Sequence, residues 1–588
     1  MTDDDSSVTR RRFLGALGAG GTLGALAGCL DGGGNGDDIG DSTTVFGTVF
    51  SHSTERAQLN PWGTQYPADF ASLVFDPAVE RTHAGRYEVG PLLDAVELDG
   101  STVTVTYSDA YTWWNGDPVD ARDAWVAHRI DEFVAPDGTP TATLVDDYTI
   151  RYSLDAPRAR HLVLSNVVRG VDAPASVFRS WLERFEDASS TAARERVAAD
   201  LRSFQLDLDT VRERGLGFGP YELVEVSPNR LLLERHDDHP NADALSIPRL
   251  WLPVAKASQA NGLIGEGTLD GGQGLLADRG ANPPDYIEQR ARYRTTGGTK
   301  LVVNWRNEHL ARRAVRRALF CALPIPTVVE NAAWGSPPRR QTGLAAPAAD
   351  DWLDDAIRAS LRTYPVAADT ERAATLLRDA GYTRDDGDWY GPNGRRLALR
   401  LDTLLDKAWG SSAQLIANSL RAFGVGVDVT QSPASSFLAV SRRDEYDLLL
   451  WWTTGTPYAA YDVTDPSPAT LGYGVTDAAT ESALGRPVEP EVPTGDGGTE
   501  TVDLLETWRR IERPTAEAET AAAARTFARW WNHALPDFYL ATATSGVWGN
   551  ARDFSWPAAD DPAYRTAGSD GHALHALLRA GDIAPAER

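Results

Sequence analysis

Residues 369–452 alternate between helical and β-strand patterns, and this alternation limits the possible folds more than any other feature of the sequence. In the first pattern, apolar residues recur at helical spacing, with Asp369 as N-cap and Gly381 as the stop. The predicted order is helix 369–381, helix 412–423, strand 425–429, a short helix 437–440 and strand 448–452. Helices and strands that alternate at this spacing are typical of parallel βαβ units. The sequence therefore predicts an α/β fold.

Shorter β patterns precede this segment. The predicted strands are 44–50, 101–107, 148–154, 221–226 and 231–234, and residues 227–229 form the turn of a hairpin between the last two. Leu484–Thr501 is rich in Pro, Gly and Glu, which predicts a surface loop. At 588 residues, the chain is long enough for several lobes around large cores.

The charge of the chain is strongly acidic. There are 57 Lys and Arg against 83 Asp and Glu, a net charge of -26, which argues against nucleic-acid binding because phosphates need a basic surface. Lys256, Lys300 and Lys407 are the only lysines. An acidic, lysine-poor surface suits a halophilic protein, since concentrated salt screens its self-repulsion. The alternative is a GC-rich genome that favours Asp, Arg and Ala codons.

The N-terminus has the pattern of an export signal. Arg10 and Arg11 belong to a twin-arginine motif that precedes a Gly/Ala-rich apolar run, 14–27. That run is shorter than the ~20 residues of a membrane-spanning helix, so residues 1–28 are interpreted as a signal peptide. Cys29 ends a lipobox-like sequence and is the expected lipid attachment site; the alternative is an ordinary small apolar residue. The Gly/Asp-rich residues 29–42 then form a flexible tether.

Only one other cysteine, Cys321, is present. Once Cys29 is lipidated, no intrachain disulfide can form, and the apolar core must supply the stability of the fold.

Several short motifs then occur in a characteristic order. They are Leu59-Asn60-Pro61, Pro91–Ala95, Val103–Trp125, Asp147–Ile150, Gly219–Tyr221, Leu233–Arg235, Ala260–Asp270, Asn304, Arg313–Leu319, Glu371–Tyr382 and Leu415–Val429. In the strongest block Trp114, Gly116, Pro118, Ala121 and Asp123 fall in register. The series resembles the extracellular solute-binding proteins of family 5, the oligopeptide- and dipeptide-binding type of ABC transporters. With its acidic composition and lipobox, the chain is similar to a haloarchaeal lipoprotein of that family.

The resemblance implies a periplasmic-binding-protein-like fold of type II, cluster C: a two-lobed α/β Venus flytrap with an extra small domain. The expected division is lobe I at 43–85, 216–299 and 526–588, the small domain at 86–215 and lobe II at 300–525. Hinged lobes close around a ligand and present a new surface to the permease.

The implied function is a non-enzymatic receptor of an ABC importer. It would capture di- or oligopeptides and deliver them to membrane permease subunits, as a monomer without cofactor, lipid-anchored to the outer face of the cytoplasmic membrane. An oligosaccharide ligand is the alternative. In peptide-binding members an Asp after the strand that corresponds to 448–452 holds the peptide α-amino group; this chain lacks the usual acidic motif there, and Asp462 fits only with a longer loop.

Candidate ligand-binding residues follow two predicted strands. Ligands of open parallel sheets bind beyond the carboxyl ends of the strands. That rule selects Asn304, Trp305, Arg306, Trp452, Thr453 and Thr454, with Tyr458 and Asp462 further along. Aromatic faces, hydroxyl groups and a guanidinium suit a peptide or a sugar. Trp451 is expected in the core instead, because alternate residues of a strand face opposite sides.

Other chemical patterns have structural explanations. Trp113 and Trp114 are expected to pack rather than to stack on a ligand, and four consecutive residues, 236–239, do not readily converge on one metal ion. Residues 29–588 contain no GxSxG, HExxH or P-loop motif, which argues against a secreted hydrolase. The third alternative, a structural lipoprotein without a ligand, predicts no thermal shift with any solute.

Overall fold

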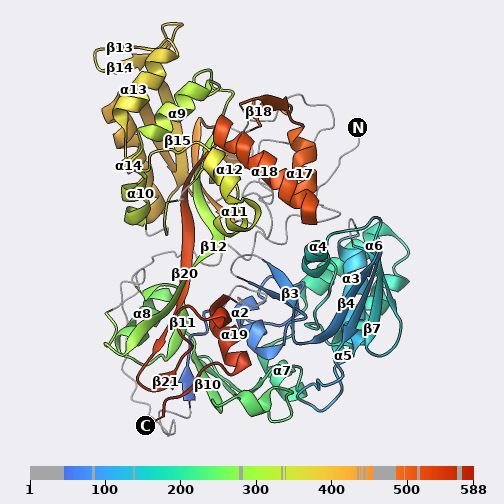
Figure 1. Cartoon of the computed structure of the whole chain (residues 1–588). Helices are drawn as coiled ribbons and strands as arrows, with labels where there is room; N and C mark the ends of the chain where they lie inside the picture. Colours follow the sequence, from blue (N-terminus) through green and yellow to red (C-terminus); the bar gives the residue numbers. More distant parts are fainter. Residues whose placement is uncertain are drawn as a thin grey trace. The chain divides into compact units, whose positions relative to one another are not determined.

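The computed structural model describes residues 45–587 with internal gaps (Figure 1). The gaps are 83–85, 137–138, 277–281, 333–334, 338–339, 434–435, 438, 441–444, 455–484, 495–496, 513–516 and 566–572. The predicted signal peptide, Cys29 and the tether lie outside the described residues. Internal contacts divide the chain into two compact units. Unit 1 comprises the residues up to Thr82, Tyr87–Arg292 and Gly546–Arg588, and unit 2 comprises His83–Arg86 and Tyr293–Ser545.

Unit 1 contains a four-stranded sheet in the order β1 (Val45–Gly47), β10 (Arg249–Pro253), β9 (Arg230–Arg235) and β8 (Tyr221–Val226). β8 and β9 form the predicted hairpin, with Tyr221 opposite Arg235. Ser227 stabilises its turn, because its Oγ accepts a hydrogen bond from the Arg230 amide at 3.2 Å. β1 pairs parallel to β10, so the first strand closes a sheet built mainly from residues almost two hundred positions later.

A second four-stranded sheet of unit 1 has the order β4 (Leu93–Asp99), β5 (Thr102–Tyr107), β7 (Thr149–Ser153) and β6 (Thr141–Leu144). α3 (Ala121–Val134) packs against this sheet and against α5 (Ala175–Asp187) (Figure 1). In β5 the apolar residues Val103, Val105 and Tyr107 are buried and alternate with threonines, as a half-buried strand requires.

Trp113 and Trp114 are buried in unit 1, which confirms the packing interpretation. The indole Nε1 of Trp114 donates to the Gly219 carbonyl at 3.1 Å. A Cβ added at Gly217 would lie 2.4 Å from the Trp114 ring, so only glycine fits there.

The sheet of unit 2 is mixed. Its strand order is β20 (Phe538–Asn550), β12 (Ile287–Val303), β17 (Leu448–Thr454), β15 (Ala398–Leu404) and β16 (Gly426–Ser432). A sixth strand, β11 (Gly271–Gln273), pairs with the part of β20 that belongs to unit 1. The unit boundary falls within β12 and β20, after Arg292 and after Ser545. β15 is parallel to both β16 and β17, as the βαβ pattern predicts, but β12 pairs antiparallel to β17.

The helices of unit 2 begin and end at capping residues. Asp369 caps α13 (Thr370–Asp379) by accepting a hydrogen bond from the Arg372 amide, and Gly381 has φ 82°. α14 (Lys407–Phe423) begins five residues before the predicted start, because Asp406 provides its N-cap. It ends as predicted at Gly424, which has φ 98°.

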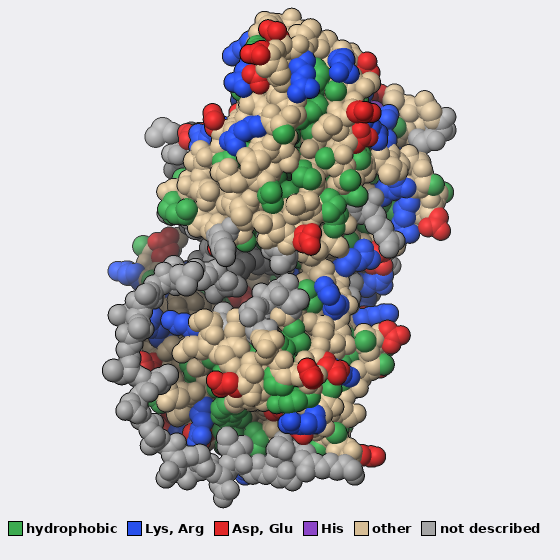
Figure 2. All heavy atoms as spheres, turned by 90° about the vertical axis from the view of Figure 1, so that its left-hand side faces the viewer, with side chains coloured by type: hydrophobic (Ala, Val, Ile, Leu, Met, Phe, Trp, Pro, Cys, Tyr) green, Lys and Arg blue, Asp and Glu red, His purple; other side chains and the backbone are tan. Residues whose placement is uncertain are grey.

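The buried core of unit 2 lies between this sheet and the helices α9 (Arg313–Cys321), α10 (Ile325–Ala332) and α18 (Glu517–Ala534). Cys321 is a free, buried thiol, and burial raises its pKa to about 11. Figure 2 shows basic and acidic side chains interspersed over the described part of one face.

The buried carboxyl group of Asp123 makes the stability of unit 1 depend on pH. Asp123 forms the capping box of α3 with Asp120, and burial raises its pKa from 3.8 to about 6. Between these pH values the folded protein binds a proton that the unfolded chain releases. The contribution of this group to the free energy of unfolding therefore falls as pH rises from 4 to 6, by about 2 kcal/mol.

Asp123→Asn should remove this contribution, because the amide does not ionise. Denaturant unfolding at a series of pH values should show a free energy of unfolding that falls less steeply than in the wild type between pH 4 and pH 6. Asp146→Asn is the control, because Asp146 is exposed and its pKa is lowered rather than raised. An unchanged slope for Asp123→Asn would contradict the prediction.

Candidate functional site

The carboxyl ends of three parallel strands meet at one edge of the unit 2 sheet. β15 and β16 are in register as far as Leu404 and Ser432, and β15 pairs with β17 at Leu401 and Leu448. β17 continues to Thr454, which lies opposite Gly297 of the antiparallel strand β12. We call this end of the sheet the carboxyl edge. It is the position where open α/β sheets bind ligands.

Two large apolar side chains are exposed at the carboxyl edge. Trp452 is 37% exposed and Leu405 is 64% exposed, whereas Leu450 is fully buried. Leu405 and Trp452 each lie four residues beyond the paired Leu401 and Leu448. Exposed apolar side chains that follow buried strands mark a surface suited to a ligand. The sequence predicts Trp452 as a site residue but not Leu405. Its position directly after the strand β15 is the feature of the sequence that could have identified Leu405.

The neighbouring Trp451 is partly buried and packs within unit 2. Its ring stacks on Phe437 with centroids 4.8 Å apart and an interplanar angle of 21°. It also packs against a buried cluster that contains Leu449 and Val302. Consecutive tryptophans thus have different environments, as the alternation of a strand predicts.

Asn304, Trp305 and Arg306 do not lie at the carboxyl edge. Val303 of β12 is opposite Leu448, the first residue of β17, so the residues that follow Val303 extend from the other end of the strand pair. Six residue steps separate Leu448 from Thr454, or about 20 Å along an extended strand. The expectation that both groups of candidates follow parallel strands is wrong, because β12 and β17 are antiparallel.

The polar groups of Asn304 and Trp305 are used within unit 2. The Asn304 side chain donates to the Tyr446 carbonyl at 2.8 Å and accepts from the Arg306 amide at 3.0 Å. The Trp305 indole is buried and donates to the Pro536 carbonyl at 3.2 Å. These contacts fix the loop after β12. Ligand contact by these two residues and by the exposed Arg306 stays a prediction.

The remaining candidates lie on or beyond β17. Thr453 and Thr454 pair with Gly298 and Gly297 through the backbone of β17. Tyr458 and Asp462 lie outside the described residues.

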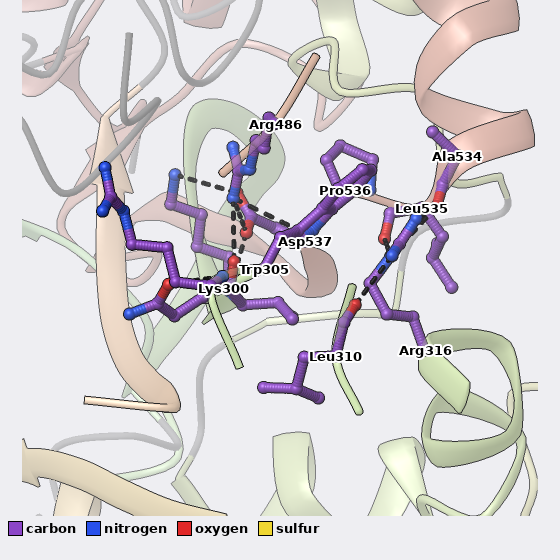
Figure 3. Close-up of polar contacts among 12 residues, drawn as sticks. Lys300, Trp305, Leu310, Arg316, Arg486, Ala534, Leu535, Pro536 and Asp537 are labelled. Atoms are coloured by element: carbon purple, nitrogen blue, oxygen red, sulfur yellow. Dashed lines mark hydrogen bonds and ion pairs between the residues drawn. The ribbon is translucent and has the colours of Figure 1, made fainter. Parts of the chain in front are cut away.

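A buried cluster of charges holds the far end of β12. One carboxylate oxygen of Asp537 accepts hydrogen bonds from Arg486 at 2.5 Å and from the Val303 amide at 2.8 Å (Figure 3). The Lys300 Nζ lies 3.9 Å from the other oxygen, and all three charged side chains are at most 1% exposed. Because buried charges are costly unless paired, this cluster fixes the positions of β12, the start of β20 and residue 486.

A second buried guanidinium joins α9 to the end of α18. Arg316 donates to the carbonyls of Leu310, Ala534 and Leu535, at 2.7 Å, 2.7 Å and 3.1 Å (Figure 3). It also lies 3.4 Å from the centre of the Trp305 ring. Burial and the charge of Arg486 lower the pKa of Arg316 well below its usual value.

In the described part of the chain, no three His, Cys, Asp or Glu side chains are grouped so as to hold a metal ion. None of the described helices combines the length and the apolar character that a membrane-spanning helix needs.

These features define an α/β two-lobed fold of the periplasmic-binding-protein type, and known structures share it. An oligopeptide-binding protein of an ABC transporter from Thermotoga maritima aligns with a TM-score of 0.66 at 15% identity, over 92% of this chain and 99% of that chain. The NikA protein of Brucella suis, solved with Fe(III)-EDTA, aligns with a TM-score of 0.60 at 16% identity, over 92% and 100%. The same Thermotoga protein, solved with mannohexaose, aligns with a TM-score of 0.57 at 15% identity, over 94% and 100%.

Sequence comparison identifies the family. The model of the bacterial extracellular solute-binding proteins, family 5, matches residues 91–472, so the chain belongs to that family. It is also 26% identical over 253 residues to the nickel-binding periplasmic protein of Escherichia coli strain K12. That match covers 41% of this chain, and the chain spans about half the length of that relative, 46%.

Replacing Arg486 tests the buried cluster. Arg486→Met should lower the free energy of unfolding by about 3–5 kcal/mol, because Asp537 would stay buried with only the more distant Lys300 as a cation. Chemical denaturation followed by tryptophan fluorescence measures the loss.

Arg510→Met is the matched control, since Arg510 pairs with Glu506 at 3.0 Å on the exposed surface of α17 (Leu504–Glu512). It should cost less than about 1 kcal/mol. A similar loss in the free energy of unfolding for both variants would show that the buried pair contributes no more to stability than the exposed pair.

Proposed function

We propose that this protein is the extracytoplasmic receptor of an ABC importer, that it captures di- or oligopeptides, and that it delivers them to membrane permease subunits without chemical change. The observation that carries the proposal is the carboxyl edge, where Trp452 and Leu405 expose apolar surface beside parallel strand ends. Apolar surface of this kind favours a ligand with apolar side chains, because its burial contributes about 25 cal/mol per Å².

An oligosaccharide is the second candidate ligand. The exposed face of Trp452 suits the apolar face of a sugar ring as well as a peptide side chain. The Thermotoga protein described as oligopeptide-binding was solved with mannohexaose, which keeps both ligand classes open for proteins of this fold.

The proposal includes the export and anchoring of the receptor. Residues 1–28 would direct twin-arginine export, Cys29 would carry the lipid, and residues 29–42 would tether the receptor to the outer face of the membrane. Lobe I would comprise 43–85, 216–299 and 526–588, the small domain 86–215 and lobe II 300–525. The net charge of -26 with three lysines supports a halophilic source.

A thermal-shift screen in molar KCl tests the ligand class. Di- to pentapeptides should raise the melting temperature, since a ligand at 100 times its Kd adds about 2.7 kcal/mol to the stability of the folded state. Stabilisation by cello- or malto-oligosaccharides alone would overturn the peptide assignment. No shift with any solute would contradict the receptor function itself.

Adjacent tryptophans provide a matched pair of variants. Trp452→Ala should weaken binding of the stabilising ligand at least tenfold while it leaves the melting temperature of the free protein nearly unchanged, because the side chain is partly exposed. Trp451→Ala should lower that melting temperature, since it removes the stack on Phe437. Calorimetric titration and thermal unfolding of both variants measure the two effects. A large loss of stability in Trp452→Ala would identify that residue as part of the core.

Cys29→Ser tests the lipid anchor. Without the thiol no lipid can attach, so the variant should move from the membrane fraction to the soluble fraction of fractionated cells. Retention of the variant in the membrane fraction would refute the lipobox interpretation.

A further inference from the structure

Three arginines of unit 2 lie close enough to His533 for their charges to act on it. Arg313 and Arg317 are on α9, Arg362 follows α12 (Asp355–Ser360), and His533 is in the last turn of α18. Arg313 donates from Nη1 to the His533 ring, and Arg317 donates to the His533 carbonyl at 2.6 Å. The backbone amide of Arg362 donates to the side chain of Asn532 at 2.7 Å, next to His533.

This cluster has no acidic partner among the described residues. The charges that act most strongly on Arg313 are those of Arg317 and Arg362, and the charges that act on His533 are those of the three arginines. In the described part of the chain, Arg317 Nε is buried without a hydrogen-bond partner. Other arginines of unit 2 pair with carboxylates: Arg510 with Glu506 at 3.0 Å and Arg525 with Asp354 at 3.5 Å. In a chain of net charge -26, like charges gathered without a carboxylate need an explanation.

We propose that Arg313, Arg317 and Arg362 form a binding site for a tetrahedral oxyanion of the phosphate or sulfate class. Guanidinium groups donate paired hydrogen bonds that match such oxyanions, and a bound dianion would offset the mutual repulsion of the three cations. The site is separate from the carboxyl edge, because α9 begins after the loop that follows the opposite end of β12. It therefore goes beyond the proposed receptor function.

The histidine supplies an internal reporter of the site. Burial and the three guanidiniums lower the pKa of His533 to about 4. A bound oxyanion cancels part of the positive field, so it should raise the pKa of His533 toward its usual value. Tyr364, which also contacts Arg317, and Cys321, on whose pKa Arg317 acts, are further titratable groups beside the cluster, and burial raises the pKa of both.

The experiment measures the binding of inorganic phosphate by calorimetric titration and thermal shift, at constant ionic strength set with KCl. Phosphate should raise the melting temperature more than chloride does. Arg313→Gln and Arg362→Gln should each weaken phosphate binding at least tenfold. Neither should lower the melting temperature of the anion-free protein, because each removes a repulsive charge. The control Arg510→Gln, which breaks a carboxylate pair, should keep wild-type affinity for phosphate.

A second readout follows the His533 imidazole by NMR, assigned by comparison with His533→Asn. Phosphate should raise its pKa by at least one unit in the wild type and not in Arg313→Gln. Equal effects of phosphate and chloride at matched ionic strength would overturn the proposal. So would an equal loss of affinity in Arg510→Gln, or a His533 pKa that phosphate does not change.

Discussion

The register between β12 and β17 determines where the chemistry of unit 2 lies. β17 runs parallel to β15 but antiparallel to β12, so the carboxyl end of β12 and that of β17 are at opposite ends of the same strand pair. One end carries the exposed Trp452 and Leu405. The other end leads into Asn304 and Trp305, whose polar groups bond within the protein. The antiparallel pairing of β12 with β17 therefore places the exposed apolar side chains and the internally bonded residues at opposite ends of the strand pair.

The end of β12 at Val303 is fixed by buried charged side chains, which would be destabilising if their partners were removed. Asp537 binds Arg486, the Val303 amide and, at greater distance, Lys300. Arg316 adds hydrogen bonds to backbone carbonyls at the end of α18. Because each buried charge would be destabilising alone, these contacts fix one arrangement of β12, α9 and α18. Arg313 and Arg317, near His533, lie on α9, whereas Arg362 follows α12. These three cations have no carboxylate partner among the described residues.

The sequence predicts those parts of the fold that depend on local signals. The caps at Asp369 and Gly424, the hairpin of β8 and β9, and the strand β17 all follow from nearby residues. β15 lies where the sequence analysis expects no element, although Leu399 and Leu401 alternate with Arg400 and Asp402. Pairing direction depends on residues far apart in the chain, and no local pattern records it. For that reason both groups of candidate residues are predicted after parallel strands, although β12 is antiparallel to β17. Leu405 is not predicted because β15, the strand that it follows, is not predicted.

Hydroxyl-radical footprinting of the protein, with and without the ligand that stabilises it, tests the central claim most directly. The account predicts that bound ligand protects Trp452 and Leu405 from oxidation and leaves the reactivity of Trp305 unchanged. Protection of Trp305 without protection of Trp452 would place the ligand at the other end of β12 and contradict the account.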